Sequence, residues 1–113
     1  MPQVNINVSK PLNNDIKNKL QLEIGNIMEI IPGKNIGNTI ICITDCCSVY
    51  KNGEAVEGAF IEVRLYKASP EESKKEFAEK MFAIFKDVLG IQPEFIYMNY
   101  LELPNWAANG SYF

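Results

Sequence analysis

The sequence predicts an α/β (α+β) fold in which two β-α-β repeats form a four-stranded mixed sheet with two helices on one face. Alternating apolar and polar residues indicate strands at 3–8 and 61–66. Each of these strands is followed by an amphipathic helix and then by another strand. A shift of 57 positions also superimposes the apolar residues of the two helices, carrying Leu20, Ile24 and Met28 onto Phe77, Met81 and Phe85.

The first repeat begins with the half-buried strand 3–8. Apolar residues then recur every three or four positions over 12–31, which predicts an amphipathic helix. Pro32 and Gly33 end that helix. Residues 39–43 are apolar except for one threonine and one cysteine, and they predict a short buried strand.

A turn joins the two repeats. Asn52 and Gly53 have the residue types that favour a hairpin or a loose turn, within the segment 50–59. The strand 61–66 comes next.

The second helix is bounded by recognisable signals. Ser69 is predicted to be its N-cap and Pro70 its first residue, with acidic residues in the first turn. Gly90 ends the helix, and residues 93–101 predict the fourth strand.

Composition narrows the classes of function. The 113 residues predict a single domain over 1–113. A net charge of −3 with one arginine, Arg64, leaves no basic surface for nucleic acid, and no apolar run is long enough for a membrane span. The chain has no histidine, which removes Ser/His triads and most zinc sites. We expect no metal and no cofactor.

Three cysteines, two of them adjacent, do not form a disulfide framework. We interpret Cys42 as a core residue and Cys46 and Cys47 as incidental. Reduced cysteines and the absence of a signal-peptide pattern favour a cytoplasmic location. Export by a route that needs no signal peptide is left open.

One face of the predicted sheet is unusually polar. Asn5, Asn7, Glu62, Arg64 and Tyr66 alternate onto the face that the helices do not cover. Sheets with parallel strand pairs are normally covered on both faces. We therefore predict that other subunits cover the polar face of this sheet, and that the polar residues face a partly wet interior of the assembly.

The two ends of the chain carry a family resemblance. "MP" at the start, "GK" at 33–34, "IYMNY" at 96–100 and "NWAANGSYF" at 105–113 occur in the order and at the spacing typical of the macrophage migration inhibitory factor family. The chain resembles that family over its whole length. The resemblance implies a tautomerase fold, a homotrimer and active sites at the subunit interfaces.

The same resemblance assigns roles near the start of the chain. Pro2 would be the catalytic base once Met1 is removed, and Lys34 and the backbone N–H of Leu65 would bind the substrate carboxylate. An α-amino group ordinarily has a pKa of about 7.7–8.0, which burial and a nearby lysine would lower. The alternatives are that Pro2 only begins an edge strand and that Lys34 is a solvated charge.

Further residues would complete the pocket. Tyr97 and Asn99 lie two positions apart, so they share one face of a strand. In the family this pair reaches into the neighbouring subunit's pocket, and the aromatic tail, here Trp106 and Phe113, closes it. Purely structural roles for the pair and for the tail are the alternatives.

Three segments depart from the family pattern, one of them the stretch after Trp106, which is slightly longer than in the animal proteins. Family members commonly have Phe-Gly-Gly where this chain has Tyr50, Lys51 and Asn52, so the shape of the pocket differs there. A Cys-x-x-Cys segment is replaced by residues 57–60, which argues against thiol–disulfide activity.

The predicted function is a keto–enol tautomerase, an isomerase of the phenylpyruvate or dopachrome type, acting on arylpyruvate-like 2-keto acids. Dehalogenation or decarboxylation of small unsaturated acids is less favoured, because those reactions use additional arginines and this chain has one. The alternative of another class is a cytokine-like or host-interaction signalling protein that binds a protein receptor and retains a vestigial pocket. The physiological substrate stays open.

Overall fold

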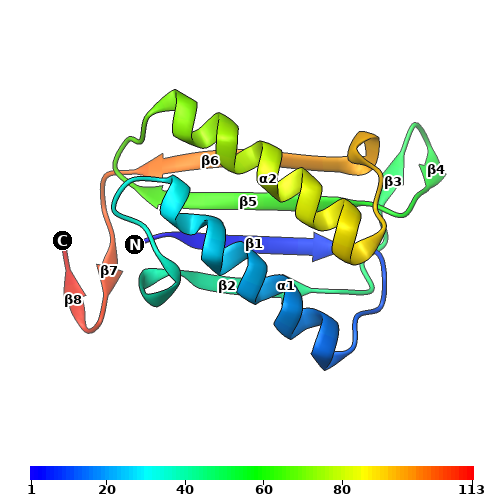
Figure 1. Ribbon diagram of the computed structural model, residues 1–113, viewed down its shortest axis with the longest axis horizontal. Helices are drawn as coiled ribbons and strands as arrows, with labels where there is room; N and C mark the ends of the chain where they lie inside the picture. The colour runs from blue at the N-terminus through cyan, green and yellow to red at the C-terminus, as the bar shows by residue number, and fades with distance from the viewer.

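Two helices pack on one face of a four-stranded sheet (Figure 1). The computed structural model describes residues 1–113. The elements are β1 Gln3–Val8, α1 Asn14–Ile27, the 3₁₀ turns η1 Met28–Ile30 and η2 Ile36–Asn38, β2 Ile40–Thr44, β3 Tyr50–Lys51, β4 Glu54–Ala55, β5 Ala59–Tyr66, α2 Glu71–Leu89, the 3₁₀ turn η3 Pro93–Phe95, β6 Ile96–Leu103, β7 Ala107–Ala108 and β8 Ser111–Tyr112.

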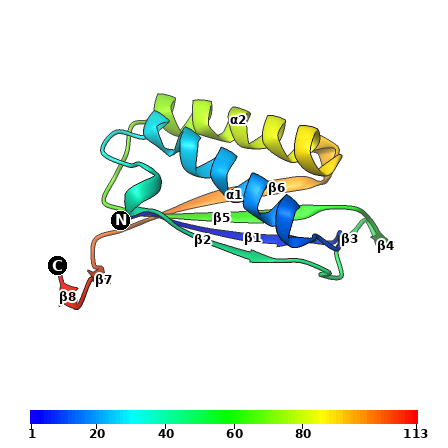
Figure 2. The ribbon, with the colours of Figure 1, turned by 60° about the horizontal axis from the view of Figure 1, so that its bottom comes forward.

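The sheet has the mixed topology that two β-α-β repeats produce. Its strand order is β2-β1-β5-β6. β1 runs parallel to β2 and β5 runs parallel to β6, while the central pair β1 and β5 is antiparallel. Figure 2 shows both helices on the same side of the sheet. The predicted fold class is confirmed.

The core lies between the sheet and the helices. β1 and β5 each send every second side chain toward the helices, where these side chains are fully or almost fully buried. The largest fully buried side chains include Phe77 and Phe85 of α2 and Leu20 and Ile24 of α1. Burial of apolar surface on this single face fixes the register of the central strands, since a one-residue slip would turn the apolar set toward solvent.

Three local predictions are wrong. α1 ends at Ile27, because the chain tightens into the 3₁₀ turn η1 before Pro32. Ser69 does not cap α2; Pro70 occupies the N-cap position, and the Ser69 backbone N–H donates to the Glu102 carboxylate at 2.6 Å.

The third wrong prediction concerns β2, which is not a buried strand. β2 lies at the edge of the sheet, and Ile40 is 60% exposed. Cys42 is exposed rather than in the core, because it pairs with Asn5 in register and therefore points to the face away from the helices.

The face opposite the helices carries the predicted polar residues, together with the exposed side chains of Ile40, Phe60, Tyr97 and Leu101. The Arg64 guanidinium donates to the Gln3 side-chain oxygen at 2.9 Å, and Asn5 Nδ2 donates to a Glu62 carboxylate oxygen at 3.4 Å. Arg64 and Glu62 also form an ion pair at 3.6 Å. No element within this chain covers these groups (Figure 2).

Two short hairpins project from the sheet. The β3–β4 hairpin turns at Asn52 and Gly53, both with positive φ, which confirms the predicted turn. The β7–β8 hairpin turns in the same way at Asn109 and Gly110. None of the helices has the length and apolar character that a membrane crossing requires.

Candidate functional site

The beginning of β1 places Pro2 at one end of the sheet. Pro2 is buried, and its carbonyl accepts a hydrogen bond from the Ile40 N–H at 3.1 Å. In the β1–β5 pairing Gln3 lies opposite Arg64, so continuing the register by one residue places Pro2 opposite Leu65. Pro2 is thus held between the edge strand β2 and the central strand β5. The Leu65 side chain is fully buried in the core, and its backbone lies in the β5–β6 pairing, in register with Glu102.

The loop after α1 brings Lys34 to the same end. Gly33 takes a positive φ of 79°, and the Lys34 N–H donates to the Ile31 carbonyl at 3.0 Å, which closes this turn. Lys34 is half-buried, with its ammonium beside the amino terminus of the chain. Burial lowers the pKa of the Met1 amino group, and the Lys34 charge and hydrogen bond lower that pKa further. An amine at this place is therefore easier to deprotonate than an ordinary α-amino group.

The aromatic tail leaves the sheet at this end too. The β7–β8 hairpin is closed by two backbone hydrogen bonds between Trp106 and Phe113. The Phe113 ring packs edge-on against the Tyr66 ring, with centroids 5.2 Å apart. The Trp106 indole Nε1 is buried and has no hydrogen-bond partner. The tail extends away from the helices and leaves Tyr112 and Phe113 exposed (Figure 2).

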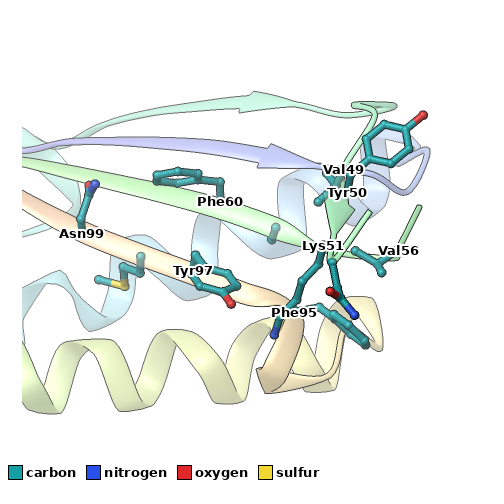
Figure 3. Close-up of a pocket in the computed structure, with 11 residues that line it drawn as sticks. Val49, Tyr50, Lys51, Val56, Phe60, Phe95, Tyr97 and Asn99 are labelled. Atoms are coloured by element: carbon teal, nitrogen blue, oxygen red, sulfur yellow. The ribbon is translucent and has the colours of Figure 1, made fainter. Parts of the chain in front are cut away.

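Tyr97 and Asn99 lie elsewhere, on β6 toward the opposite end of the sheet. Both face a pocket of about 540 Å³ between the β3–β4 hairpin and the first residues of β5 and β6 (Figure 3). Tyr97 pairs with Phe60 across the β5–β6 ladder, and the two rings are 55% and 46% exposed. The remaining lining residues are Val49, Tyr50, Lys51, Asn52, Val56, Ala59, Phe95 and Met98.

The predicted site residues therefore form two separate groups within one chain. Leu65, opposite Pro2, and Phe60, opposite Tyr97, are five residues apart on β5. At about 3.3 Å per residue this separation is roughly 17 Å. One small substrate cannot touch both Pro2 and Tyr97 of the same chain.

Two residues of this pocket, Lys51 and Phe60, were not among the predicted site residues. Lys51 Nζ donates to the Glu94 carbonyl at 2.6 Å and lies 5.3 Å from the centre of the Tyr97 ring. A signal for Phe60 was present, because it is an apolar residue in the same strand phase as Glu62, Arg64 and Tyr66. The signal for Lys51 was its place in the segment that departs from the family pattern.

No arrangement of three or more histidine, cysteine or acidic residues in the structure could hold a metal ion. Cys46 and Cys47 come directly after Asp45, whose carboxylate accepts the Leu12 N–H at 2.8 Å and pairs with Lys17 at 3.6 Å. Burial and the neighbouring Asp45 raise the pKa of the Cys46 thiol, which opposes thiolate formation.

Comparison with known proteins identifies the fold. No protein-family model matches the sequence, and no curated protein matches it significantly. The structure is similar to MIF2 of Leishmania major, with a TM-score of 0.93 and 22% identity over 100% of this chain and 97% of that one. A macrophage migration inhibitory factor-like protein of Entamoeba histolytica has a TM-score of 0.87 and 22% identity, over 99% and 98% of the two chains. R7 fused 4-OT, an asymmetric trimer, has a TM-score of 0.85 and 13% identity, over 96% and 94%.

The chain thus has the fold of the tautomerase superfamily. Its structure is similar to those of macrophage migration inhibitory factor-like proteins. The fold expected from the two ends of the sequence is confirmed.

Proposed function

We propose that this protein is a keto–enol tautomerase of arylpyruvate-like 2-keto acids, with Pro2 as the general base. The observation that carries the proposal is the meeting of Pro2, Lys34 and the Leu65 backbone at one end of the sheet. An amine with a lowered pKa, a cation and a backbone segment are the groups that proton transfer next to a carboxylate requires.

Each group has a defined task in this reaction. Removal of Met1 converts the Pro2 nitrogen from an amide into a secondary amine with a basic lone pair. That amine takes a proton from the carbon beside the substrate carbonyl, the enolate oxygen takes up a proton from water, and the protonated amine then returns its proton to water, which regenerates the base. Lys34 and the Leu65 N–H bind the substrate carboxylate. Burial and Lys34, which lower the pKa of the Met1 amino group, would lower the pKa of the Pro2 amine in the same way and so favour its unprotonated, basic form.

We further propose that three copies of the chain assemble and share their active sites. The uncovered polar face, the exposed edge strand β2 and the projecting aromatic tail would all be buried by neighbouring copies. Assembly would also bring Tyr97 and Asn99 of one chain to Pro2 of the next, which a single chain cannot do. The trimer formed by R7 fused 4-OT, which has this fold, supports the proposal.

Turnover of phenylpyruvate by protein of verified intact mass tests the activity. We expect turnover from protein that lacks Met1, sedimenting at about 38 kDa, three times the chain mass of 12.8 kDa. A folded trimer without Met1 that turns over no arylpyruvate would contradict the enzyme and favour the receptor-binding alternative.

Subunit mixing tests whether sites are shared. Pro2→Gly and Tyr97→Ala each disable every site of their own trimer. In a mixed trimer, at least one site combines an intact Pro2 with an intact Tyr97 from its neighbour. Co-refolding the two inactive variants should therefore restore part of the activity. If the mixture is no more active than its components, the sites are not shared.

A further inference from the structure

We propose that the pocket beside the β3–β4 hairpin binds a second carboxylate of the substrate, at the end remote from the 2-keto acid. The preferred substrates would then be arylpyruvate-like acids that carry another carboxylate on the ring. This inference rests on the proposed function, which places Tyr97, and with it this pocket, at the active site of a neighbouring chain. The residue that carries the inference is Lys51.

Lys51 is held in place by the pocket wall. Its side chain extends from the hairpin toward β6 (Figure 3). Its ammonium lies 5.3 Å from the Tyr97 ring centre and 5.5 Å from the Phe95 ring centre, and it donates to the Glu94 carbonyl at 2.6 Å. A lysine ammonium has three N–H donors, so two remain after the bond to Glu94.

The pocket provides this cation with no counter-charge. Of its eleven lining residues none is acidic, and Lys51 is the only charged one. Lys51 takes part in none of the ion pairs of the structure, in contrast to Lys17, Arg64 and Lys74. Two ring faces and one carbonyl stabilise the ammonium without neutralising it. An anion that enters this largely apolar pocket would form a charge-assisted hydrogen bond of the stronger kind.

The remainder of the pocket fits an aromatic ring. Phe60 and Tyr97 lie side by side with about half of each side chain exposed, and Asn99 lies two residues further along β6. The volume of about 540 Å³ is ordinary for a small-molecule site. A substrate ring against Phe60 and Tyr97 would have Lys51 at its far side, while Lys34 of the neighbouring chain binds the 2-keto acid. Two cations from two chains would thus select a substrate with two carboxylates.

Paired substrates test the inference during turnover. Lys51→Met keeps most of the side-chain volume and removes the charge, and Lys80→Met, at an exposed position of α2, is the matched control. For 4-carboxyphenylpyruvate we expect Lys51→Met to raise KM about tenfold, and for phenylpyruvate less than twofold. Lys80→Met should change neither, and Lys51→Arg should retain the preference for the diacid.

Equilibrium binding separates this inference from the proposed function. Binding of 4-carboxycinnamate and of cinnamate, neither of which has a keto group to tautomerise, is measured by calorimetry. The wild-type protein should prefer the dicarboxylate about tenfold, and Lys51→Met should abolish that preference with unchanged thermal stability. This result would support the pocket even if no arylpyruvate is turned over. Normal turnover of phenylpyruvate together with no preference for the dicarboxylate, or with equal losses for both ligands in Lys51→Met, would overturn the inference and leave the proposed function intact.

Discussion

The two halves of the chain share a backbone plan but differ in the residue that follows the left-handed glycine after the helical segment. In both halves the helical segment leads into a glycine with positive φ, Gly33 at 79° and Gly90 at 69°. The next residue is Lys34 in the first half and Ile91 in the second. Ile91 is fully buried in the core, whereas Lys34 is half-buried beside the amino terminus. A left-handed glycine therefore leads into a packed residue in one half and into a half-buried lysine in the other.

The antiparallel pairing of β1 with β5 separates the equivalent positions of the two halves. Because the two halves run in opposite directions, equivalent positions lie at opposite ends of the sheet. The first half places Pro2 and Lys34 at one end, and the second half places Tyr97 and Asn99 toward the other. Under the proposed function, each chain would thus carry two half-sites that another copy completes.

The largest expected effect comes from blocking the nitrogen of Pro2. A variant with an uncleaved residue before Pro2 has an amide there, with no basic lone pair, so turnover of phenylpyruvate should fall by about 10²–10⁴-fold. Pro2→Gly, which exposes a primary amine, should cause a loss in the same range. Both variants should sediment as wild-type trimers. Wild-type turnover by an amino-terminally extended protein, its mass verified, would exclude Pro2 as the base.

The next effect is on the pH dependence of turnover. The unprotonated amine is the active form, so kcat/KM should rise about tenfold per pH unit below the amine pKa and level off above it. Burial and Lys34 lower the pKa of an amine at this place, so the midpoint should lie below the ordinary value of 8.0. Lys34→Met removes one of these two causes and should move the midpoint upward, toward 8.0. A midpoint that does not move would mean that burial alone sets the pKa.

Loss of the Lys34 charge should also weaken substrate binding. Lys34→Ala removes a charged hydrogen bond worth about 1.5–3 kcal/mol, so KM for phenylpyruvate should rise roughly ten- to a hundredfold. KM for the corresponding methyl ester, which lacks the charge, should change little. Lys80→Ala is the control for a change in overall charge. Equal effects on acid and ester would assign Lys34 to tuning Pro2 rather than to binding the carboxylate.

Most of the fold was predictable because its signals are local. Alternation of apolar residues, helical periodicity, Gly90 and the Asn52–Gly53 turn each depend on neighbouring residues, and the structure confirms them. The exposure of β2 was not predictable in the same way. An apolar run such as Ile40–Thr44 can form either a central strand or an edge strand, and the sequence does not distinguish the two positions. The wrong prediction that Cys42 is a core residue has the same cause.

The site was predictable only in part. The proximity of Lys34 to the chain start depends on the sheet order β2-β1, which no local pattern specifies. The family resemblance supplied Pro2, Lys34, Tyr97 and Asn99 as candidates, but it could not supply Lys51, because the family pattern is absent there. Tertiary contacts with Tyr97 and Phe95 reveal that lysine.

The smallest expected effect comes from replacing Gly33 or Gly90, the equivalent glycines of the two halves, by alanine. An alanine in place of either Gly33 or Gly90 would have to adopt a left-handed conformation, which costs about 1–2 kcal/mol. Space is available at both positions. A Cβ at Gly33 meets nothing within 4 Å, and a Cβ at Gly90 meets only Lys10 Nζ, at an ordinary 3.6 Å. The free energy of unfolding in urea, at one protein concentration, should therefore fall by similar amounts. Only Gly33→Ala should also raise KM for phenylpyruvate, because Gly33 directs the chain into Lys34, whereas Gly90 directs it into the buried Ile91. An equal rise in KM from Gly90→Ala would show that general loosening of the fold, not the placement of Lys34, limits substrate binding.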